Sequence, residues 1–324
     1  MLPIAVDALG GDKAPAEIID GAKQAAALGI PVLLIGPADL GKRFDIGDLP
    51  LHVATEFIDM HEDPASSVRT KKDSTLVQSA ELVRDGVASA TISAGNTGAT
   101  MASALLRMGR IKGVKRPAIA TPIPVPGSTH TVLLDAGANA EVEAEWLTQF
   151  AIMGSVYSRV RFGIDKPRVG LLSIGEEPGK GDTLRKESYE LLSACNAINF
   201  IGNVEGRDIT TDAVDVVVTD GFTGNVALKT LEGSMRSIVK ALFAAIGAPQ
   251  YKEHADAIMP ALLDLYAIFD PDSTGGAILL GVDGVSIISH GSSSARAMLN
   301  GIKVAQEMVE SNMVGLIAEA LQPK

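Results

Sequence analysis

Six clusters of glycine with polar or charged residues recur along the sequence, and each follows a short apolar run. Glycine leaves backbone N–H groups open to a ligand, and a helix that starts just after such a cluster adds positive potential at its N-terminus. These features bind anions such as phosphate, although a single cluster can equally be a tight turn between a strand and a helix. Six clusters gathered at one edge of a sheet favour a shared anion site. They comprise residues 7–12, 93–98, 135–139, 175–181, 220–225 and 290–293.

The elements that must position these clusters are apolar runs alternating with helix-like stretches. Runs that are apolar throughout indicate strands buried on both faces, as in mostly parallel sheets covered by helices. The expected fold class is α/β, a three-layer α/β/α arrangement with a large mostly parallel sheet. Ligands of such sheets bind beyond the carboxyl ends of the strands, so we expect all six clusters at one edge. The expected strands are 4–7, 32–36, 91–95, 131–135, 169–175, 199–202, 214–220 and 285–290, and the expected helices are 16–28, 78–83, 99–108, 141–157 and 183–192.

The length and composition limit the functions that the chain can have. Its 324 residues are predicted to form a single α/β/α domain over 1–324, and a division into two lobes around a central cleft stays open. The 28 Lys and Arg against 39 Asp and Glu give a net charge of −11, whereas a nucleic-acid binder needs a basic surface. Eight Phe, four Tyr and one Trp also supply few rings for stacking on single-stranded bases.

The cysteine count and the apolar runs indicate the cellular location of the protein. The single cysteine, Cys195, excludes an internal disulfide and a cysteine-cluster metal site, and such usage is typical of a reducing cytosol. The first residues have the pattern of a strand and lack the basic start of a signal peptide. The longest uncharged run, 86–106, contains too many Gly, Asn, Ser and Thr residues for a spanning helix. We therefore expect a cytoplasmic protein.

Several segments are similar to known catalytic or nucleotide-binding motifs but do not match them. In the segment 175–181, three residues separate the first two glycines and Gly181 stands where a P-loop has Ser or Thr. No G-x-G-x-x-G follows the first strand, and the five histidines have no metal-binding spacing. The sequence from Gly291 to Ala295 lacks the last glycine of a nucleophile elbow. The sequence thus has no clear nucleotide-binding or metal-binding motif.

The loop sequences resemble the PlsX family of bacterial phosphate acyltransferases. The resemblance covers nearly the whole chain, with the blocks in the order that the family has. Thr100 and Ile278 depart from the expected pattern, and the segment 241–272 matches least. The blocks that carry the resemblance are residues 4–12, 72–74, 93–99, 134–139, 199–208, 220–225 and 290–293.

The resemblance implies a reaction in which a long-chain acyl group moves from an acyl-carrier-protein thioester to inorganic phosphate. The product is an acyl phosphate, which a downstream glycerol-3-phosphate acyltransferase uses to begin phospholipid synthesis. The family fold is similar to phosphotransacetylase and to isocitrate dehydrogenase-like enzymes. The family is homodimeric, needs no cofactor, and is cytoplasmic with transient, weak membrane contact. Because a thioester is already activated, phosphate itself can attack, and the enzyme needs only N–H donors and a cation.

The resemblance also assigns roles to residues in the glycine clusters. Lys180 and Asn225 are the expected catalytic residues; the alternatives are a solvated loop lysine and a helix N-cap. The ammonium of Lys180 would pair with phosphate or the oxyanion, and the amide of Asn225 would donate to a carbonyl oxygen. The other loop residues are expected to bind substrate, or else to cap helices and satisfy loop amides. They are Asp7, Gly10, Gly11, Asp12, Lys72, Asp73, Gly95, Asn96, Thr97, Gly98, Asp135, Asn139, Thr223, Gly224, His290, Gly291 and Ser292.

Two further segments are candidate interaction surfaces. Residues 86–134 contain no Asp or Glu but five cations, which predicts a docking surface for an acidic acyl carrier protein. The alternative is that these cations pair with acids elsewhere in the fold. Apolar residues at helical spacing over 255–269 favour core or dimer packing over membrane contact, because no Lys or Arg occurs between Lys252 and Arg296. The five cations are Arg107, Arg110, Lys112, Lys115 and Arg116.

Three other functions stay open. A phosphotransacetylase-like enzyme acting on acyl-coenzyme A would have the same fold and the same phosphate chemistry. A non-catalytic module that binds small anions or a carrier protein would also use glycine loops. A decarboxylating dehydrogenase of this fold class would need an acidic metal cluster and a nucleotide site, and neither has a clear signature here.

Overall fold

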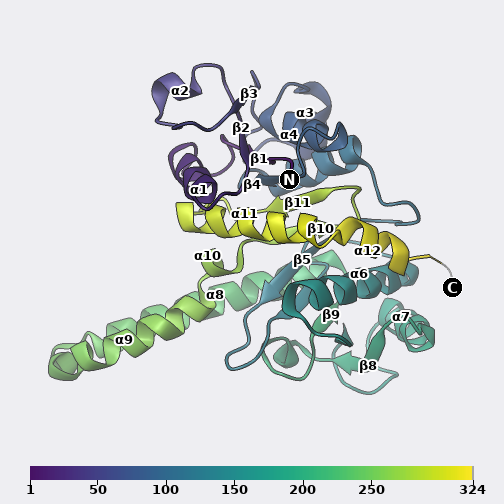
Figure 1. Ribbon diagram of the computed structural model, residues 1–324. Coiled ribbons are helices and arrows are strands. Elements are labelled where there is room, and N and C mark those ends of the chain that lie inside the picture. Colours follow the sequence, from purple (N-terminus) through teal and green to yellow (C-terminus); the bar gives the residue numbers. More distant parts are fainter. Residues whose placement is uncertain (323–324) are drawn as a thin grey trace.

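A single sheet of eleven strands runs through the chain in a computed structural model, which describes residues 1–322 without the side chains of residues 252, 253 and 271 (Figure 1). The strands lie in the order β3-β2-β1-β4-β11-β10-β5-β6-β9-β7-β8. They are β1 (Ile4–Asp7), β2 (Val32–Gly36), β3 (Leu51–Val53), β4 (Ala90–Ser93), β5 (Ala118–Ile123), β6 (Thr131–Leu134), β7 (Arg168–Leu172), β8 (Asn199–Val204), β9 (Val216–Val218), β10 (Ala277–Leu280) and β11 (Val285–Ile288).

Twelve α-helices connect and cover these strands in the described part of the chain. They are α1 (Ala16–Ala27), α2 (Leu40–Arg43), α3 (Pro64–Thr70), α4 (Thr75–Arg84), α5 (Thr97–Ser103), α6 (Ala144–Phe162), α7 (Thr183–Ala194), α8 (Gly221–Ile246), α9 (Lys252–Phe269), α10 (Pro271–Thr274), α11 (Ala295–Glu310) and α12 (Met313–Ala320).

Helices cover both faces of the sheet. In β1, Ile4 joins a core with α1 and α11, whereas Ala5 joins a separate core with Leu82 of α4. In β6, Leu134 joins the core with α6, whereas Leu133 packs in a cluster with α8. Because consecutive strand residues point to opposite faces, these cores lie on opposite sides of the sheet. The predicted three-layer α/β/α fold with a mostly parallel sheet is confirmed.

The strands form two parallel groups that run in opposite directions. Strands β3, β2, β1, β4 and β11 are parallel to one another and make up the β1 group. Strands β6, β9, β7 and β8 make up the β6 group. Between them, β10 is antiparallel to β11 and β5, and β5 is antiparallel to β6. These three reversals leave the two groups antiparallel, so the expectation that all six glycine clusters lie at one sheet edge is wrong.

The expected strands and helices are present, with shifted ends. The structure contains three further strands that were not predicted from the sequence. The helix expected at 99–108 begins at Thr97, and its last turn, Ala104–Met108, is a π-helix. The missed strands are β3, β5 and β10. Strand β3 has only three residues, and β5 contains Pro122, which usually argues against a central strand because it has no N–H to donate. Strand β10 follows Gly275 and Gly276, which both have positive φ.

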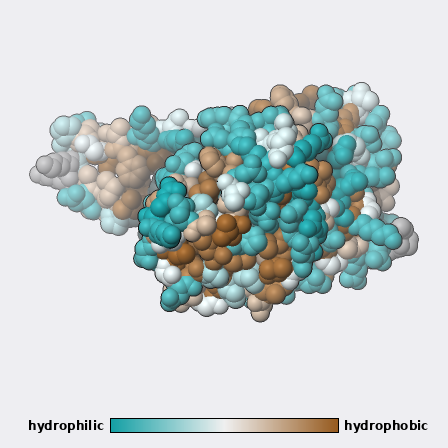
Figure 2. All heavy atoms as spheres, turned by 90° about the horizontal axis from the view of Figure 1, so that it is seen from above, coloured by the Kyte–Doolittle hydropathy of each residue, from teal (hydrophilic) through white to brown (hydrophobic). Residues whose placement is uncertain are grey.

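The outer part of α8 and the whole of α9 project from the body as an arm, residues 236–269 (Figure 1). The two helices pack on each other, with the rings of Phe243 and Tyr266 6.5 Å apart. Their outer faces are apolar and exposed, as Figure 2 shows, and Ile258 is 46% exposed. Core packing of the apolar stretch 255–269 is therefore wrong, although Ala255 is buried. None of the helices in residues 1–322 is long and apolar enough to cross a membrane.

Candidate functional site

A cavity of about 330 Å³ lies where the two strand groups meet. We call it the central cavity. The β1 group contributes loops after β1 and β11 and the start of α5, and the β6 group contributes the loop after β6 and the first turns of α8. Strands β5 and β10 form the wall between them. The lining residues that were expected to bind or react are Asp12, Thr97, Asn225, His290 and Gly291.

Asp7 braces the loops of the β1 group from inside. Its carboxylate accepts hydrogen bonds from Leu9 N (3.1 Å) and from Ser93 Oγ (2.7 Å), and burial raises its pKa. A Cβ at Gly10 would lie 2.6 Å from Asp7 Oδ2 and 2.7 Å from Gly95 N, so the loops approach too closely for any other residue. Asp7, Gly10 and Gly95 therefore hold the loops together and do not line the cavity.

The loop after β1 is tied to the loop after β11. Asp12 N donates to Gly291 O (2.7 Å), and Gly11, with φ of 110°, makes the turn that allows it. His290 Nδ1 accepts from Ser292 N (3.2 Å) and lies 2.8 Å from Ser292 Oγ. Because Nδ1 is the acceptor, the proton of a neutral ring is on Nε2. His290 can therefore donate from Nε2 at the cavity, and Ser292 sets the orientation of its ring.

Asn96 is fully used by the fold, whereas Thr97 beside it lines the central cavity. Asn96 Oδ1 caps α5 by accepting from Ala99 N (3.0 Å). Its Nδ2 donates to Met60 O (3.0 Å) and Glu62 O (3.1 Å). A Cβ at Gly98 would lie 2.6 Å from Pro64 Cγ, so this glycine also serves packing. The capping interpretation holds for Asn96, which positions the segment that carries Met60.

Lys72 and Asp73 lie away from the lining of the central cavity. Asp73 Oδ2 accepts from Thr55 N (2.9 Å) and from Thr55 Oγ1, and these two hydrogen bonds lower its pKa. Lys72 is exposed, and its backbone oxygen accepts from Gln78 Nε2 (3.2 Å). Both residues belong to the turn that leads into α4.

Asp135 braces the loops of the β6 group, as Asp7 does on the other side. Its carboxylate accepts five hydrogen bonds, four from backbone N–H groups and one from Asn139 Nδ2 (2.8 Å). Burial raises the pKa of Asp135 against the pull of these donors. A Cβ at Gly224 would lie 1.9 Å from Asp135 O, so α8 can start here only with glycine at that position. Asp135, Asn139 and Gly224 thus fix where α8 begins.

Asn225 is held at the cavity by this arrangement. The N-cap of α8 is Asp220, whose Oδ1 accepts from Thr223 N (2.8 Å). The interpretation of Asn225 as an N-cap is therefore wrong, because it lies in the second turn. It is exposed and lines the central cavity, and a Cβ at Gly137 would lie 3.5 Å from its Cγ. Glycine at position 137 leaves its amide room.

Lys180 is exposed on the loop between β7 and α7, and it does not line the central cavity. Its backbone N–H donates to Glu177 O (3.0 Å), which closes a turn. A separate hollow next to this loop is lined by Ser173, Gly181, Arg185 and Thr223 among others. The structure therefore places the two expected catalytic residues in neighbouring segments of the β6 group, Lys180 on a loop and Asn225 on α8, but not around one cavity.

Arg185, which the sequence analysis missed, joins these neighbouring loops. Its guanidinium pairs with Asp182 (3.2 Å), the N-cap of α7, and with Asp220, the N-cap of α8. It also donates to Thr219 Oγ1 (3.0 Å) and Thr223 Oγ1 (3.1 Å). Burial disfavours the charged form of Asp220, but its hydrogen bonds from Thr223 and the charge of Arg185 lower its pKa. The sequence signal that could have identified Arg185 was its position three residues after Asp182, just beyond a glycine turn.

The five cations expected to dock a carrier differ in their surroundings. Arg107 is 22% exposed and lies 3.5 Å from Glu81, so its charge is partnered inside the fold. Arg110 is exposed and donates to Lys115 O, and Arg116 stacks over Trp146 at 4.9 Å. Lys112, Lys115 and Arg116 are exposed as well.

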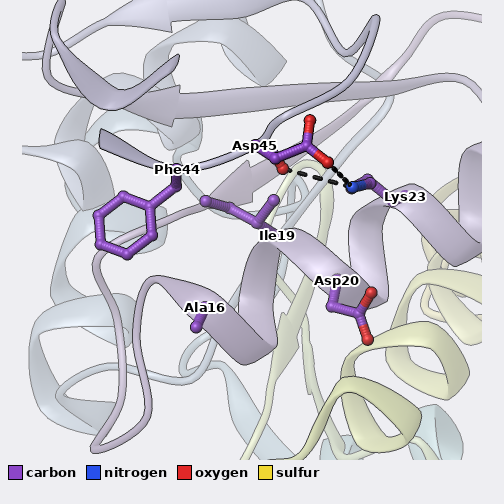
Figure 3. A pocket seen from close by; sticks show the side chains of 6 residues that line it. All are labelled: Ala16, Ile19, Asp20, Lys23, Phe44 and Asp45. Carbon is purple, nitrogen blue, oxygen red and sulfur yellow. Dashed lines mark hydrogen bonds and ion pairs between the residues drawn. The ribbon is translucent and has the colours of Figure 1, made fainter. Parts of the chain in front are cut away.

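A further hollow lies in the β1 group between α1 and the segment after α2 (Figure 3). Lys23 Nζ pairs there with Asp45 Oδ2 at 2.6 Å, and Ile19 and Phe44 form part of its wall. It contains none of the expected site residues. Within residues 1–322, no three His, Cys, Asp or Glu side chains are grouped to hold a metal ion.

Comparisons with known proteins decide the family. The model of the family described as "Fatty acid synthesis protein" matches residues 2–315. This chain belongs to that family. Relatives named "Phosphate acyltransferase" from Elusimicrobium minutum and Desulfitobacterium hafniense are each 48% identical to it, over 98% and 99% of this chain and 95% and 98% of theirs. The family resemblance expected from the loops is thus confirmed.

The fold is also that of a solved phosphotransacetylase. The structure from Streptococcus pyogenes matches with a TM-score of 0.61 over 95% of this chain and 94% of that one, at 18% identity. At that identity the likeness concerns the fold alone. It agrees with the phosphotransacetylase-like arrangement expected from the sequence.

Proposed function

We propose that the protein transfers a fatty acyl group from an acyl-carrier-protein thioester to inorganic phosphate. The observation that carries this proposal is the central cavity, which is lined by Asn225 of the β6 group and His290 of the β1 group in a chain 48% identical to a phosphate acyltransferase. The acyltransferase activity itself is what its family members are named for. That the acyl donor is a carrier protein is the part of the proposal that an experiment must establish.

The proposed reaction needs hydrogen-bond donors from the enzyme but no enzyme nucleophile. A phosphate oxygen attacks the thioester carbonyl carbon, the C–S bond breaks, and the thiolate takes a proton as it leaves. In this proposal the Asn225 amide donates to the oxyanion that develops on the carbonyl oxygen. The Nε2–H of His290 donates to phosphate or to the leaving sulfur. Asp12, Thr97 and Gly291 form the wall around the same space.

Lys180 is proposed to supply the cation of this site. We propose that the two strand groups act as two lobes of one catalytic domain and that the β7–α7 loop brings Lys180 to the phosphate beside Asn225. Lys180→Ala should then raise the KM for phosphate and lower kcat while the melting temperature stays unchanged. Near-wild-type kinetics of the folded variant would remove Lys180 from the mechanism. Lys186→Ala, on the following helix, is the matched control.

The decisive experiment supplies phosphate with each of two donors. The protein is incubated with radiolabelled phosphate and either acyl-acyl carrier protein or acyl-coenzyme A, and acyl phosphate is measured as the label that enters the lipid-extractable product. Product from the carrier thioester at much higher kcat/KM supports the proposal. Product from coenzyme A alone would make the protein a phosphotransacetylase-like enzyme. Binding of the carrier without product would make it a binding module.

The remaining partners are proposals as well. The exposed apolar faces of the arm, with Ile258 and Leu263 at 46% and 53% exposure, fit contact with a second copy of the chain. A dimer mass in light scattering that Leu263→Asp converts to a monomer supports this interpretation. A monomeric wild type that floats with lipid vesicles would assign the arm to the weak membrane contact instead. A downstream glycerol-3-phosphate acyltransferase would consume the acyl phosphate.

A further inference from the structure

A second, apolar pocket adjoins the central cavity. It measures about 90 Å³ and lies between β5, the middle of α8 and the end of α9. Four residues line both spaces, so the two share a wall. These residues are Thr121, Leu228, Glu232 and Thr274.

One face of α8 leads from the reacting groups into this apolar pocket. Asn225 and Leu228 line the central cavity, and Leu228, Leu231 and Met235 line the pocket. Residues three and four apart share a helix face, so these side chains form one stripe. The stripe extends about 15 Å from Asn225 to Met235, at 1.5 Å per residue. The two pockets thus follow one another along this face of α8, starting at Asn225.

The chemistry of the walls changes along this path. Near Asn225 the central cavity contains Asp12, Thr97 and His290, whereas the far pocket is lined by Ile123 and Pro122 of β5 and by further apolar side chains. Glu232 lies at the junction, and its carboxylate is paired with Lys229 at 2.9 Å. The polar end suits a phosphate and a carbonyl, and the apolar end suits a hydrocarbon chain. The apolar side chains on α8 and α9 are Leu228, Leu231, Met235 and Phe269.

We propose that this apolar pocket holds the acyl chain of the substrate and that Leu231 and Met235 determine which chain lengths fit. The proposal rests on the proposed function, since it places the carbonyl carbon at Asn225. Met235 lies farthest along the stripe, so it meets the end of a long chain, whereas Leu231 meets its middle. Each methylene that leaves water on binding strengthens binding by about fourfold. Affinity should therefore rise with chain length until the chain reaches Met235.

The test measures binding of alkyl phosphonates of increasing length to the full chain by calorimetry, because binding does not depend on turnover. In the wild type, Kd should fall about fourfold per added methylene and then level off. Leu231→Trp should make it level off at shorter chains, and Met235→Ala should extend the rise to longer ones. Leu191→Trp, on the exposed face of α7 at 40% exposure, is the matched control. Melting temperatures show that each variant folds.

The outcomes separate this proposal from the proposed function. A wild-type Kd that does not change with chain length, or variants with the wild-type profile, would overturn the pocket assignment. Variants that change the oligomeric mass but not the phosphonate profile would overturn it too and give the pocket to a second copy of the chain. Length-dependent binding without any acyl phosphate formed from either thioester would support the pocket and contradict the proposed function.

Discussion

The two strand groups reach the central cavity by different means. The β1 group presents His290 on a short loop and Thr97 at the start of α5, and the loops of this group are braced by the Asp7 carboxylate and its hydroxyl partner Ser93. The β6 group presents Asn225 from a long helix, which is seated by Asp135 and joined to the neighbouring loop through Arg185. Both groups therefore use buried acids as braces, but only the β6 group includes a buried ion pair.

This difference shows how to separate bracing residues from reacting ones. The carboxylates of Asp7 and Asp135 accept hydrogen bonds from their own loops and from a neighbouring strand, and burial raises the pKa of each. Asp220 is the contrast, because its hydrogen bonds and Arg185 lower its pKa although burial opposes this. None of these three lines the central cavity, so changing them should affect stability first. Asn225 and His290 should affect turnover first.

The largest effect is expected at Arg185. Its side chain is 10% exposed and its partner Asp220 is 8% exposed, so Arg185→Met leaves a buried carboxylate without its cation. Removal of one partner of a buried pair costs about 3–5 kcal/mol. The free energy of unfolding in urea measures this loss. Arg207→Met is the matched control: Arg207 also contacts several acids but is 69% exposed, so about 0–1 kcal/mol is expected.

The same pair predicts how the Arg185→Met loss depends on pH. The pKa of Asp220 is lowered in the folded protein, so the stability that this group contributes is present above its ordinary value of 3.8. It is lost as pH falls through the lowered folded pKa. The gap between wild type and Arg185→Met should therefore close in acid. A gap that stays constant down to that range would mean that packing, and not charge, causes the loss.

The next largest effects are expected at two asparagines, one of which should affect turnover and the other stability. Asn225→Ala removes a proposed oxyanion donor, which lowers kcat by about 100- to 1000-fold, and should leave the melting temperature unchanged. Asn139→Ala removes the donors to Asp135 (2.8 Å) and Pro117 O (2.8 Å), so it should destabilise the fold. Steady-state kinetics and thermal unfolding of both variants decide the assignment. Equal losses of stability would show that Asn225 is another brace.

The two bracing carboxylates should respond differently to an amide. In Asp135→Asn, the new NH₂ faces N–H donors that cannot accept, such as Asn139 N at 2.8 Å, so about 1–3 kcal/mol is lost. In Asp7→Asn, the NH₂ faces Ser93 Oγ, which can accept, so little is lost. Urea unfolding of the two variants measures this. Equal losses would contradict the idea that donor chemistry distinguishes the two loops.

The stability difference between Asp7→Asn and the wild type should change with pH in a defined direction. Burial raises the pKa of Asp7 in the folded protein, so its contribution is full below 3.8 and is lost as pH rises through the folded pKa. An asparagine does not titrate. The variant should therefore gain stability relative to the wild type as pH rises, and urea unfolding at several pH values follows the difference. A difference that does not depend on pH would contradict the raised pKa.

Periodicity and glycine positions were enough to predict most of this fold. Runs such as residues 4–6 are apolar throughout because both faces of the sheet are covered, and β1 is buried at every position. Strand direction was not predictable, since the reversals at β10 and β5 follow from which strands pair and not from their residue types. Pro122 in β5 even argued against a strand there. The sequence could not show that the glycine clusters belong to two opposed groups.

The site was predictable to the level of loops but not of side chains. Glycine clusters located the loops that meet at the cavity, because close approach and positive φ leave few alternatives to glycine, as at Gly11 and Gly224. Polar residues in those loops had two equivalent interpretations, and Asn96 and Asp135 proved to be used within the fold. Arg185 was not predicted because its partners lie as far as 38 residues away in the chain.

The smallest effect is expected in the stretch 107–116, which is predicted to dock the carrier and whose charges are mostly exposed. Arg110, Lys112 and Lys115 are exposed cations in a stretch without Asp or Glu, whereas Arg107 is partnered by Glu81. Exposed charges act over about 10 Å at 0.1 M salt, so they speed encounter more than they strengthen binding. Reversal of Lys112 to Glu should raise the KM for the carrier a few-fold at low salt and much less at high salt. Lys42→Glu, on α2, is the control, and a KM unchanged by salt in the wild type would contradict electrostatic docking.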